Sequence, residues 1–199
     1  RPDDAIFGEE FGKSAGTSGL TWVLDPIDGT RAFISGAPSW GVLIGLDAGH
    51  GPVLGIVDQP YIGERFVGGF GKADWARDGV QREISVRGCE GLDNAIIMTT
   101  FPEVGTLEEG AAFAAVSAKC KLTRFSLDCY AYALLAMGQI DLVIEAQLNA
   151  YDVQGPIGVV QGAGGIVTDW QGNPAHNGGQ IIAAGDARVH AAALEILNK

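Results

Sequence analysis

Two carboxylates three residues apart are the groups in this chain best suited to chemistry. They lie in the stretch Asp25-Pro26-Ile27-Asp28-Gly29-Thr30, which follows the apolar run 21–24. Two carboxylates about 4 Å apart repel each other by roughly 4 kcal/mol at an effective dielectric constant of about 20, so the pair requires a cation. The backbone N–H groups of a short helix opening at Gly29-Thr30 would bind a phosphate beside that cation. The stretch therefore predicts a metal site next to a phosphate site.

Two other acidic positions, far away in sequence, are candidates to join this pair. Glu9 lies in Gly8-Glu9-Glu10, and Asp152 follows Tyr151 after an apolar strand-like run. Oxygen ligands favour Mg²⁺ or Mn²⁺ over zinc, which prefers His and Cys. Two such ions about 3.5–4 Å apart would activate water and stabilise the leaving oxygen of an in-line phosphoryl displacement. We therefore expect the three acidic segments to converge.

Each acid also has a simpler interpretation when taken alone. Glu9 and Glu10 would form a solvated surface pair, Asp25 would cap a turn because Asp before Pro is common there, and Asp152 would be a helix N-cap. The Asp-Pro-Ile-Asp-Gly-Thr motif does not reduce to a turn in this way, because a turn requires neither the second acid nor the Gly-Thr pair.

Composition limits the class of protein. The 199 residues are 47% hydrophobic and 19% charged, which is typical of a globular domain. A net charge of −11 argues against a nucleic-acid partner, which would need basic clusters. No apolar run approaches the roughly 18 residues that span a bilayer, and no signal peptide is visible. We therefore predict a cytoplasmic protein that binds neither nucleic acid nor membrane.

The cysteines and histidines suggest no separate chemistry. Cys89, Cys120 and Cys129 are scattered and form no CxxC pair, which is typical of reduced thiols in a cytosolic protein rather than of a disulfide or a zinc site. The three histidines do not neighbour a plausible nucleophile. A histidine-based triad therefore has little support.

The elements that must position these acids differ between the two halves of the chain. The first half predicts antiparallel strands, at 40–46, 53–57, 65–67 and 81–86, with turns at 68–69 and 78–79. The second half alternates: strands at 94–99, 120–124 and 141–144, and helices at 107–118, 129–137 and 189–197. This pattern predicts one layered α/β domain over 1–199, with a sheet-rich lobe at about 1–90 and an α/β lobe at about 91–199.

These motifs together resemble the three signatures of the inositol monophosphatase family. The signatures correspond to Gly8-Glu9-Glu10, to residues 22–30, and to Tyr151-Asp152 with the downstream Ala163-Gly164-Gly165. Residues 31–41 and Asp128-Cys129-Tyr130-Ala131-Tyr132 most resemble the bacterial histidinol-phosphatase branch. The resemblance covers essentially the whole chain. It implies the layered αβαβα sandwich of this family.

The resemblance also implies metal ligands. Glu9, Asp25 and the carbonyl of Ile27 would hold a first Mg²⁺, whose water is the nucleophile. Asp25, Asp28 and Asp152 would hold a second Mg²⁺, beside the oxygen that leaves. Four carboxylates against two divalent cations are neutral overall, so a phosphate dianion would meet metal ions rather than bare acids.

Further roles follow from the same resemblance. Thr30, together with Glu9, would orient and help deprotonate the attacking water. The N–H groups of Gly29 and Thr30 would cradle the phosphate beside Asp28. Glu145 matches the family position that contacts the alcohol part of the substrate, where a carboxylate would pair with an ammonium or imidazole group. A homodimer is implied as well.

Three departures from the family pattern carry expectations of their own. The chain begins just before the first signature, where the family usually has a pair of helices, so the resemblance predicts an N-terminally truncated chain. Pro156 removes a donor and disfavours a helical Gly155, so we expect the helix after Asp152 to start late or to be distorted. Phe125-Ser126-Leu127 stands where the histidinol-phosphatase branch tends to have glycines, which predicts a narrower substrate pocket.

The function expected from these residues is Mg²⁺-dependent hydrolysis of a small phosphate monoester, with histidinol phosphate as the first candidate. Inositol 1-phosphate or another polyol phosphate is the alternative substrate. The competing classes are a catalytically silent, metal-binding homologue and a structural acidic scaffold.

Overall fold

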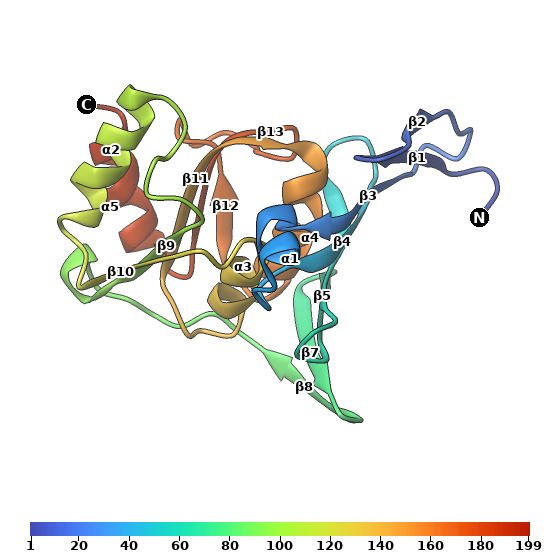
Figure 1. The fold of residues 1–199 in the computed structure, drawn as a ribbon, viewed down its shortest axis with the longest axis horizontal. Coiled ribbons are helices and arrows are strands. Elements are labelled where there is room, and N and C mark those ends of the chain that lie inside the picture. The colour runs from blue at the N-terminus through green and yellow to red at the C-terminus, as the bar shows by residue number, and fades with distance from the viewer.

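Two β-sheets and two pairs of helices alternate in layers across the molecule. The structure is a computed structural model that describes residues 1–199. An eight-stranded sheet packs on α3 and α4, which in turn pack on a five-stranded sheet, and α2 and α5 cover the outer face of that second sheet (Figure 1). The helices are α1 (Thr30–Ser35), α2 (Leu107–Ser117), α3 (Cys129–Ala136), α4 (Ala150–Gly162) and α5 (Ala187–Leu197). No helix combines the length and the hydropathy that crossing a bilayer requires.

The larger sheet is mainly an antiparallel meander. Its strand order is β2-β1-β3-β4-β5-β6-β7-β8, and only β1 and β3 pair in parallel. The strands are β1 (Ala5–Gly8), β2 (Gly12–Ser14), β3 (Thr21–Asp28), β4 (Gly41–Asp47), β5 (Pro52–Gln59), β6 (Glu64–Gly69), β7 (Lys72–Arg77) and β8 (Val80–Ile84). The strands predicted in the first half are confirmed as β4, β5, β6 and β8. Strands β1, β2 and β7 were not predicted: β1 and β2 are only four and three residues long, and β7 contains no β-branched side chain.

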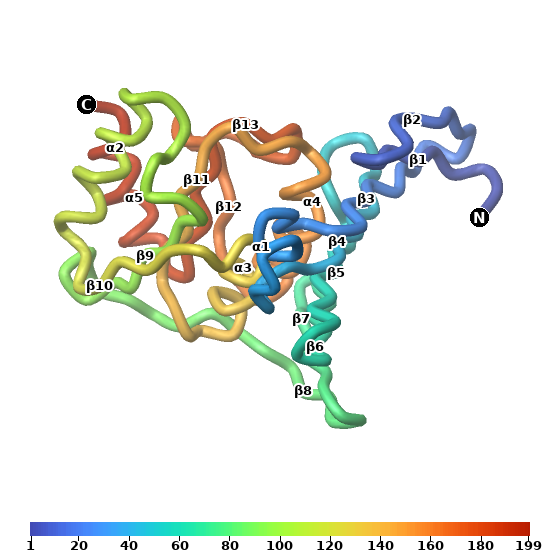
Figure 2. The backbone as a smooth tube through the Cα atoms, viewed as in Figure 1, coloured from blue at the N-terminus to red at the C-terminus, as the bar shows by residue number.

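The smaller sheet contains the second half of the chain. An extended connection over 85–91 leads into it from β8 (Figure 2). Its strands, in the order β10-β9-β11-β13-β12, are β9 (Ile96–Thr99), β10 (Leu122–Phe125), β11 (Leu142–Asn149), β12 (Ile166–Thr168) and β13 (Gly178–Ala184). The helices predicted at 107–118, 129–137 and 189–197 and the three predicted strands are confirmed. The prediction omitted β12 and β13.

Helix α4 lies unusually close to the large sheet because glycines face each other across the contact. A Cβ on Gly55 would lie 2.1 Å from the carbonyl oxygen of Gly155, and a Cβ on Gly158 would lie 2.4 Å from the nitrogen of Gly55. A Cβ on Gly68 would lie 2.4 Å from the carbonyl oxygen of Gly158. Backbone therefore rests on backbone, and side chains on either surface would push the helix away.

This contact explains why the expected late or distorted start of α4 is wrong. The helix begins at Ala150, includes Gly155, and continues through Pro156 to Gly162. Proline removes one backbone hydrogen bond from the helix. Buried packing on both sides of Pro156 offsets that loss, since tertiary contacts often override local preference.

Two Gly→Ala substitutions in helices test the importance of this packing. Gly158→Ala should destabilise the protein by about 2 kcal/mol or more, because the new methyl group meets strand backbone that cannot yield. Gly110→Ala in α2 is the matched control: its Cβ would come no closer than 3.5 Å to another atom, so the better helix propensity of alanine should stabilise by roughly 0.5–1 kcal/mol. Denaturant unfolding measures both changes. Equal effects of the two substitutions would contradict the proposed packing.

Candidate active site

A bulge in β3 brings Asp25 and Asp28 to the same side. Residues three apart on a regular strand point to opposite faces of a sheet. The pairing of β3 with β4 shifts register between Asp25 and Asp28, however, so the strand bends there. Pro26 lies at the bend, beyond the last pair that β1 makes with β3, so its missing N–H breaks no bond on that side. The proline therefore fits the geometry that converges the two acids.

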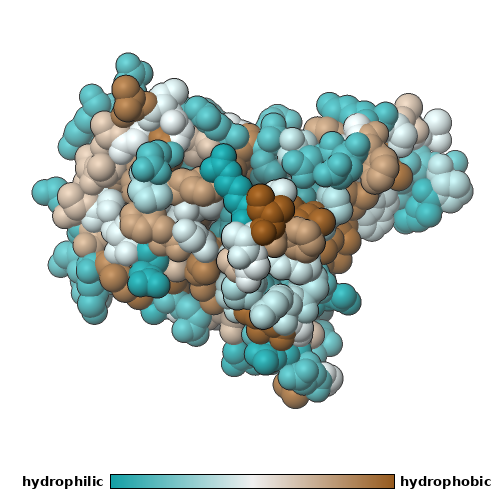
Figure 3. Space-filling model, viewed as in Figure 1, coloured by the Kyte–Doolittle hydropathy of each residue, from teal (hydrophilic) through white to brown (hydrophobic).

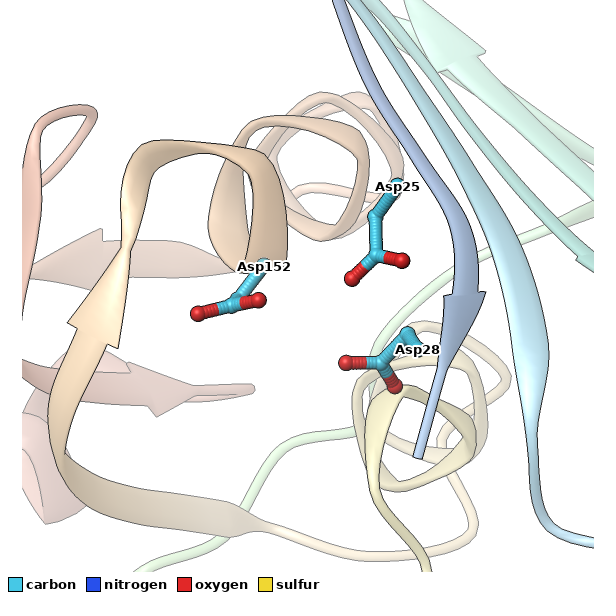
Figure 4. Close-up of side chains that lie close together, drawn as sticks. All are labelled: Asp25, Asp28 and Asp152. Carbon is cyan, nitrogen blue, oxygen red and sulfur yellow. The ribbon is translucent and has the colours of Figure 1, made fainter. Parts of the chain in front are cut away.

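Asp152 approaches the pair from the first turn of α4. Asp152 Oδ2 accepts hydrogen bonds from two nitrogens of Asn149, the backbone N (2.6 Å) and the side-chain Nδ2 (3.3 Å). Asn149 is the N-cap of α4 and Asp152 is the third residue of the helix, so the two form a capping box. Ligand oxygens of Asp25, Asp28 and Asp152 all lie within 4.8 Å of one another, and the three side chains point toward a common centre (Figure 4).

Backbone N–H groups hold each of these carboxylates in place. The nitrogen of Ile27 donates to Asp25 Oδ1 at 3.0 Å, and the nitrogen of Cys129, at the start of α3, donates to Asp28 Oδ2 at 2.8 Å. With the bond from Asn149 to Asp152, three different segments orient three acids. The cluster is preorganised rather than a chance meeting of surface side chains.

The three acids strain one another electrostatically. Burial, together with the negative charges of Asp28 and Glu9, raises the pKa of Asp25 to about 8. Burial also raises the pKa of Asp28 to about 7, against the hydrogen bonds from Cys129. The pKa of Asp152 is raised for the same first reason, burial. Groups in this condition are stabilised by a cation that replaces their protons.

Glu9 borders the cluster without belonging to its close core. Its backbone nitrogen donates to the carbonyl of Leu24 at 3.2 Å, which extends the β1–β3 ladder and places Glu9 beside Asp25. Its side chain is exposed, and its charge contributes to the raised pKa values of Asp25 and Asp152.

Helix α1 opens immediately after Asp28. Gly29 is its N-cap with φ 78°, a left-handed conformation that glycine adopts without strain, and the first bond within the helix runs from the nitrogen of Phe33 to the carbonyl of Gly29. The N–H groups before Phe33 thus have no partner within the helix. Thr30 Oγ1 donates to the carbonyl of Ile27 at 3.2 Å. Helix α1 also exposes the apolar side chains of Phe33 and Ile34. Figure 3 shows a hydrophobic patch near the centre of the view, in the region where α1 lies in Figure 1.

A cavity of about 610 Å³ opens beside the cluster, between the end of β3 with α1 and the ends of β9 and β11. It is lined by six of the residues expected in the site: Glu9, Asp28, Gly29, Thr30, Glu145 and Asp152. Asp25 is 1% exposed, and Ile27 is half-buried. The structure therefore gathers the residues that the sequence analysis selected around one cavity and the carboxylate cluster next to it.

The cavity also contains residues to which the sequence analysis gave no role. Asp128, Thr100 and Tyr132 line it, as do Arg31 and Glu103. The guanidinium carbon of Arg31 lies 4.7 Å from the ring centroid of Phe101, which joins α1 to the segment after β9. For Asp128 and Tyr132 the available signal was the segment 128–132, which resembles the histidinol-phosphatase branch. Thr100 and Glu103 carry no such signal, and only the three-dimensional structure places them at the cavity.

The expected narrowing of the cavity by residues 125–127 is wrong. None of these residues lines it, and Phe125 is 38% exposed. Ser126 has φ 68° and Asp128 has φ 47°, backbone conformations that glycine favours. The chain therefore keeps the left-handed turn conformation without glycines, and the side chains of residues 125–127 lie outside the cavity lining.

The donor set fits a hard divalent cation. Its ligand atoms are all carboxylate oxygens, contributed by Asp25, Asp28 and Asp152, and the buried carboxylates gain from added positive charge. Mg²⁺ and Mn²⁺ prefer such oxygen ligands, whereas zinc sites usually contain His or Cys.

Comparisons with known proteins agree with this site. The chain matches the inositol monophosphatase family over residues 1–199 and belongs to this family. It is similar to the chloroplastic bifunctional phosphatase IMPL2 of Arabidopsis thaliana (41% identity; 98% of this chain and 59% of that protein) and to the histidinol-phosphatase of Streptomyces coelicolor (32% identity; 100% and 77%). The chain thus spans less than two thirds of the plant protein.

Solved structures show the same fold. An inositol monophosphatase from Zymomonas mobilis superposes with a TM-score of 0.90 at 42% identity, over 100% of this chain and 77% of that one. A similar superposition, with a TM-score of 0.88 at 28% identity, is found for the extragenic suppressor protein SuhB of Bartonella henselae. The predicted fold class, the α/β sandwich of the inositol monophosphatase type, is confirmed.

The raised pKa of Asp25 predicts how the metal-free protein responds to pH. The pKa of its carboxyl group is about 8 in the folded protein, against an ordinary value of 3.8. At a pH between these two values the folded state therefore holds a proton on Asp25 that the unfolded state has lost. The free energy of unfolding should therefore fall as pH rises from about 4 to about 8. Asp25→Asn should weaken this fall. Thermal unfolding in a chelator measures it, and adding MgCl₂ should stabilise the wild type far more than the variant. Identical pH slopes for the two proteins would contradict the assignment.

Proposed function

We propose that this chain is a Mg²⁺-dependent phosphatase that hydrolyses a small phosphate monoester by direct attack of water. The observation that carries the proposal is the convergence of Asp25, Asp28 and Asp152 within 4.8 Å beside a cavity of about 610 Å³. A structural acidic scaffold has no reason to hold buried carboxylates at this spacing against their mutual repulsion. Membership of the inositol monophosphatase family supports the same reaction class.

In this proposal, Glu9, Asp25 and the Ile27 carbonyl hold one divalent cation, and Asp25, Asp28 and Asp152 hold another. Bound cations would supply a water of lowered pKa and neutralise charge at the leaving oxygen. The position of Glu9 outside the close cluster, but beside Asp25, suits a ligand to one of the two cations only.

The remaining residues at the start of α1 bind and orient the reactants. The N–H groups of Gly29 and Thr30, which precede the first bond within α1, donate to the phosphate oxygens. The Thr30 hydroxyl, which donates a hydrogen bond to the Ile27 carbonyl, orients the attacking water. Glu9 accepts the proton that this water releases. Since water attacks directly, no covalent phosphoenzyme forms.

Histidinol phosphate is the proposed substrate. Away from the acids assigned to the cations, the cavity is lined by three carboxylates, of Glu103, Asp128 and Glu145, and by a single basic side chain, that of Arg31. This excess of negative charge favours an alcohol that carries positive charge over a neutral polyol. Three of the similar curated proteins are named histidinol-phosphatases. Inositol 1-phosphate remains the second candidate, supported by similar proteins named inositol monophosphatases.

The organisation of the active protein is part of the proposal. We propose one phosphatase domain over 1–199, made of the two lobes expected from the sequence, that acts as a homodimer in the cytoplasm. The family resemblance supports the homodimer, and the reduced state of all three cysteines is compatible with a cytosolic compartment.

Removal of a shared metal ligand tests the reaction class. Asp25→Asn should lower kcat/KM with Mg²⁺ by roughly 10²–10³-fold, because a cation contributes several kcal/mol of transition-state stabilisation. The release of inorganic phosphate from a panel of phosphate esters measures kcat/KM. Glu108→Asp, which keeps the charge of an exposed side chain, is the control. Calorimetric Mg²⁺ binding by a wild type that hydrolyses no ester would instead identify the silent homologue.

Glu145→Gln tests the substrate preference. The preference for histidinol phosphate over inositol 1-phosphate, measured as a ratio of kcat/KM values, should fall about tenfold, the scale of one charged contact. The melting temperature of the variant must be measured alongside, because Glu145 is 7% exposed and bonded to neighbouring side chains. An unchanged ratio in a folded variant would remove Glu145 from substrate recognition.

A further inference from the structure

A buried side-chain amide ties the helix that carries Asp152 to the large sheet. Gln154 Nε2 donates to Asp47 Oδ2 at 2.8 Å, at the end of β4, and to the carbonyl of His176 at 3.1 Å, just before β13. The side chain of Gln154 is 3% exposed and does not line the cavity. The first turns of α4 are therefore bonded to two segments that lie far from the carboxylate cluster in sequence.

Asp47 is a rigid acceptor because the turn after β4 holds it. Asp47 Oδ1 accepts hydrogen bonds from the backbone nitrogens of Gly49 (2.6 Å) and Gly51 (3.2 Å), which leaves Oδ2 for Gln154. A Cβ on Gly45 would lie 2.7 Å from Gln154 Cβ, so the absence of a side chain there makes room for Gln154 on the sheet. The strand thus provides both the space for Gln154 and a fixed partner for its amide.

The hydrophobic effect does not explain a glutamine at this position. Gln154 Oε1 is buried and has no hydrogen-bond partner, and an unpaired buried acceptor costs about 1–3 kcal/mol. An apolar side chain of the same length, such as that of methionine, would fill the space without this cost. What glutamine adds is a directional bond between α4 and Asp47.

Direction matters here because the rest of the contact is smooth. Glycine backbone on helix and sheet fixes how far apart they lie, but it offers no side chains that interlock and resist rotation of α4 about its axis. Asp152 and Gln154 are two positions apart, so their side chains leave the helix in directions roughly 200° apart. A bond on the Gln154 side therefore restrains the rotation that would move Asp152.

The carboxylate cluster is sensitive to such a rotation. Asp152 projects from the first turn of α4 toward Asp25 and Asp28, and the ligand oxygens of the three lie within 4.8 Å of one another (Figure 4). At a helix radius of about 5–6 Å, a rotation of about 15° would displace the Asp152 carboxylate by about 1.5 Å. Mg²⁺ demands near-ideal octahedral geometry at about 2.0–2.1 Å, so a displacement of this size would weaken binding.

We propose that Gln154 is a positioning residue for the metal centre. Its bond to Asp47 sets the rotation of α4 and so places the carboxylate of Asp152 in the cluster. Gln154 itself contacts neither cation nor substrate. The inference rests on the metal site of the proposed function and not on the identity of the ester.

The Mg²⁺ affinity of Gln154→Met tests this role. Methionine keeps the length of the side chain and removes both hydrogen bonds. Calorimetric titration with MgCl₂, without any ester, should give a dissociation constant about tenfold above that of the wild type, because loss of groups that orient metal ligands typically costs 10–100-fold in affinity. In assays, the Mg²⁺ concentration for half-maximal rate should rise by a similar factor, while kcat at saturating Mg²⁺ falls by less than about threefold, since excess cation refills the site.

Gln59→Met is the matched control. Gln59 is also a fully buried glutamine of the large sheet; its Nε2 donates to the carbonyl of Pro38 and its Oε1 accepts from the nitrogen of Ile62. This substitution should lower the melting temperature at least as much as Gln154→Met does, yet leave the Mg²⁺ affinity within about twofold of the wild type, because distant sites act independently. Unchanged Mg²⁺ affinity in Gln154→Met, or equal losses in the two variants, would overturn the role of Gln154.

Asp47→Ala removes the same bond from the strand side and leaves α4 unaltered, so it decides the question if Gln154→Met does not fold. Its dissociation constant for Mg²⁺ should rise by at least about threefold, and an unchanged value would overturn the proposal. A wild type that binds Mg²⁺ but hydrolyses no ester would refute the phosphatase function, and the affinities of the variants would still decide the role of Gln154. A wild type that binds no Mg²⁺ would overturn both.

Discussion

The close contact between helix α4 and the large sheet is the constraint on which the candidate site depends. Asp152 lies on the first turn of α4, whereas Asp25 and Asp28 lie on β3, so the separation of helix and sheet sets the separation of the carboxylates. Glycines on both surfaces let the backbones touch: a Cβ on Gly55 would lie 2.1 Å from the carbonyl oxygen of Gly155. A layer of ordinary side chains would move the helix outward by several ångströms and separate Asp152 from its partners.

That contact brings like charges together, and the surrounding backbone restrains the repulsion that results. Each carboxylate accepts an N–H bond from a different segment, from Ile27, Cys129 and Asn149. These bonds lower the pKa of each acid, but burial outweighs them, so the pKa of Asp25 still rises to about 8. The protein thus keeps the acids in place without fully stabilising their negative charges. A bound cation would supply the stabilisation that is missing.

Much of the large sheet and of the acid set could be predicted from the sequence, because both depend on local patterns. The apolar runs that became β4 and β5 carry a strand signal with turn residues between them, and Asp25 and Asp28 lie within one six-residue motif. Failures came where neighbours in space decide. The expectation for α4 was wrong because it counted the lost hydrogen bond of Pro156 and not the sheet beneath. Strand β13 was missed because its run Ile181-Ile182-Ala183-Ala184 is buried on both faces and shows no alternation.

The sequence by itself determined which groups are present: the acids, the glycines, the strand and helix periods, and the family to which they point. Those properties are local, since side-chain chemistry and backbone preference act within a few residues. Only the tertiary structure decided which acids meet and which remain free. Asp152 is more than a hundred positions from Asp25, Glu145 accepts hydrogen bonds from Thr100 and Tyr132, and the Asp128 carboxylate packs against Gly29. Hydrogen bonding and charge depend on distance in space, which a linear order of residues does not contain.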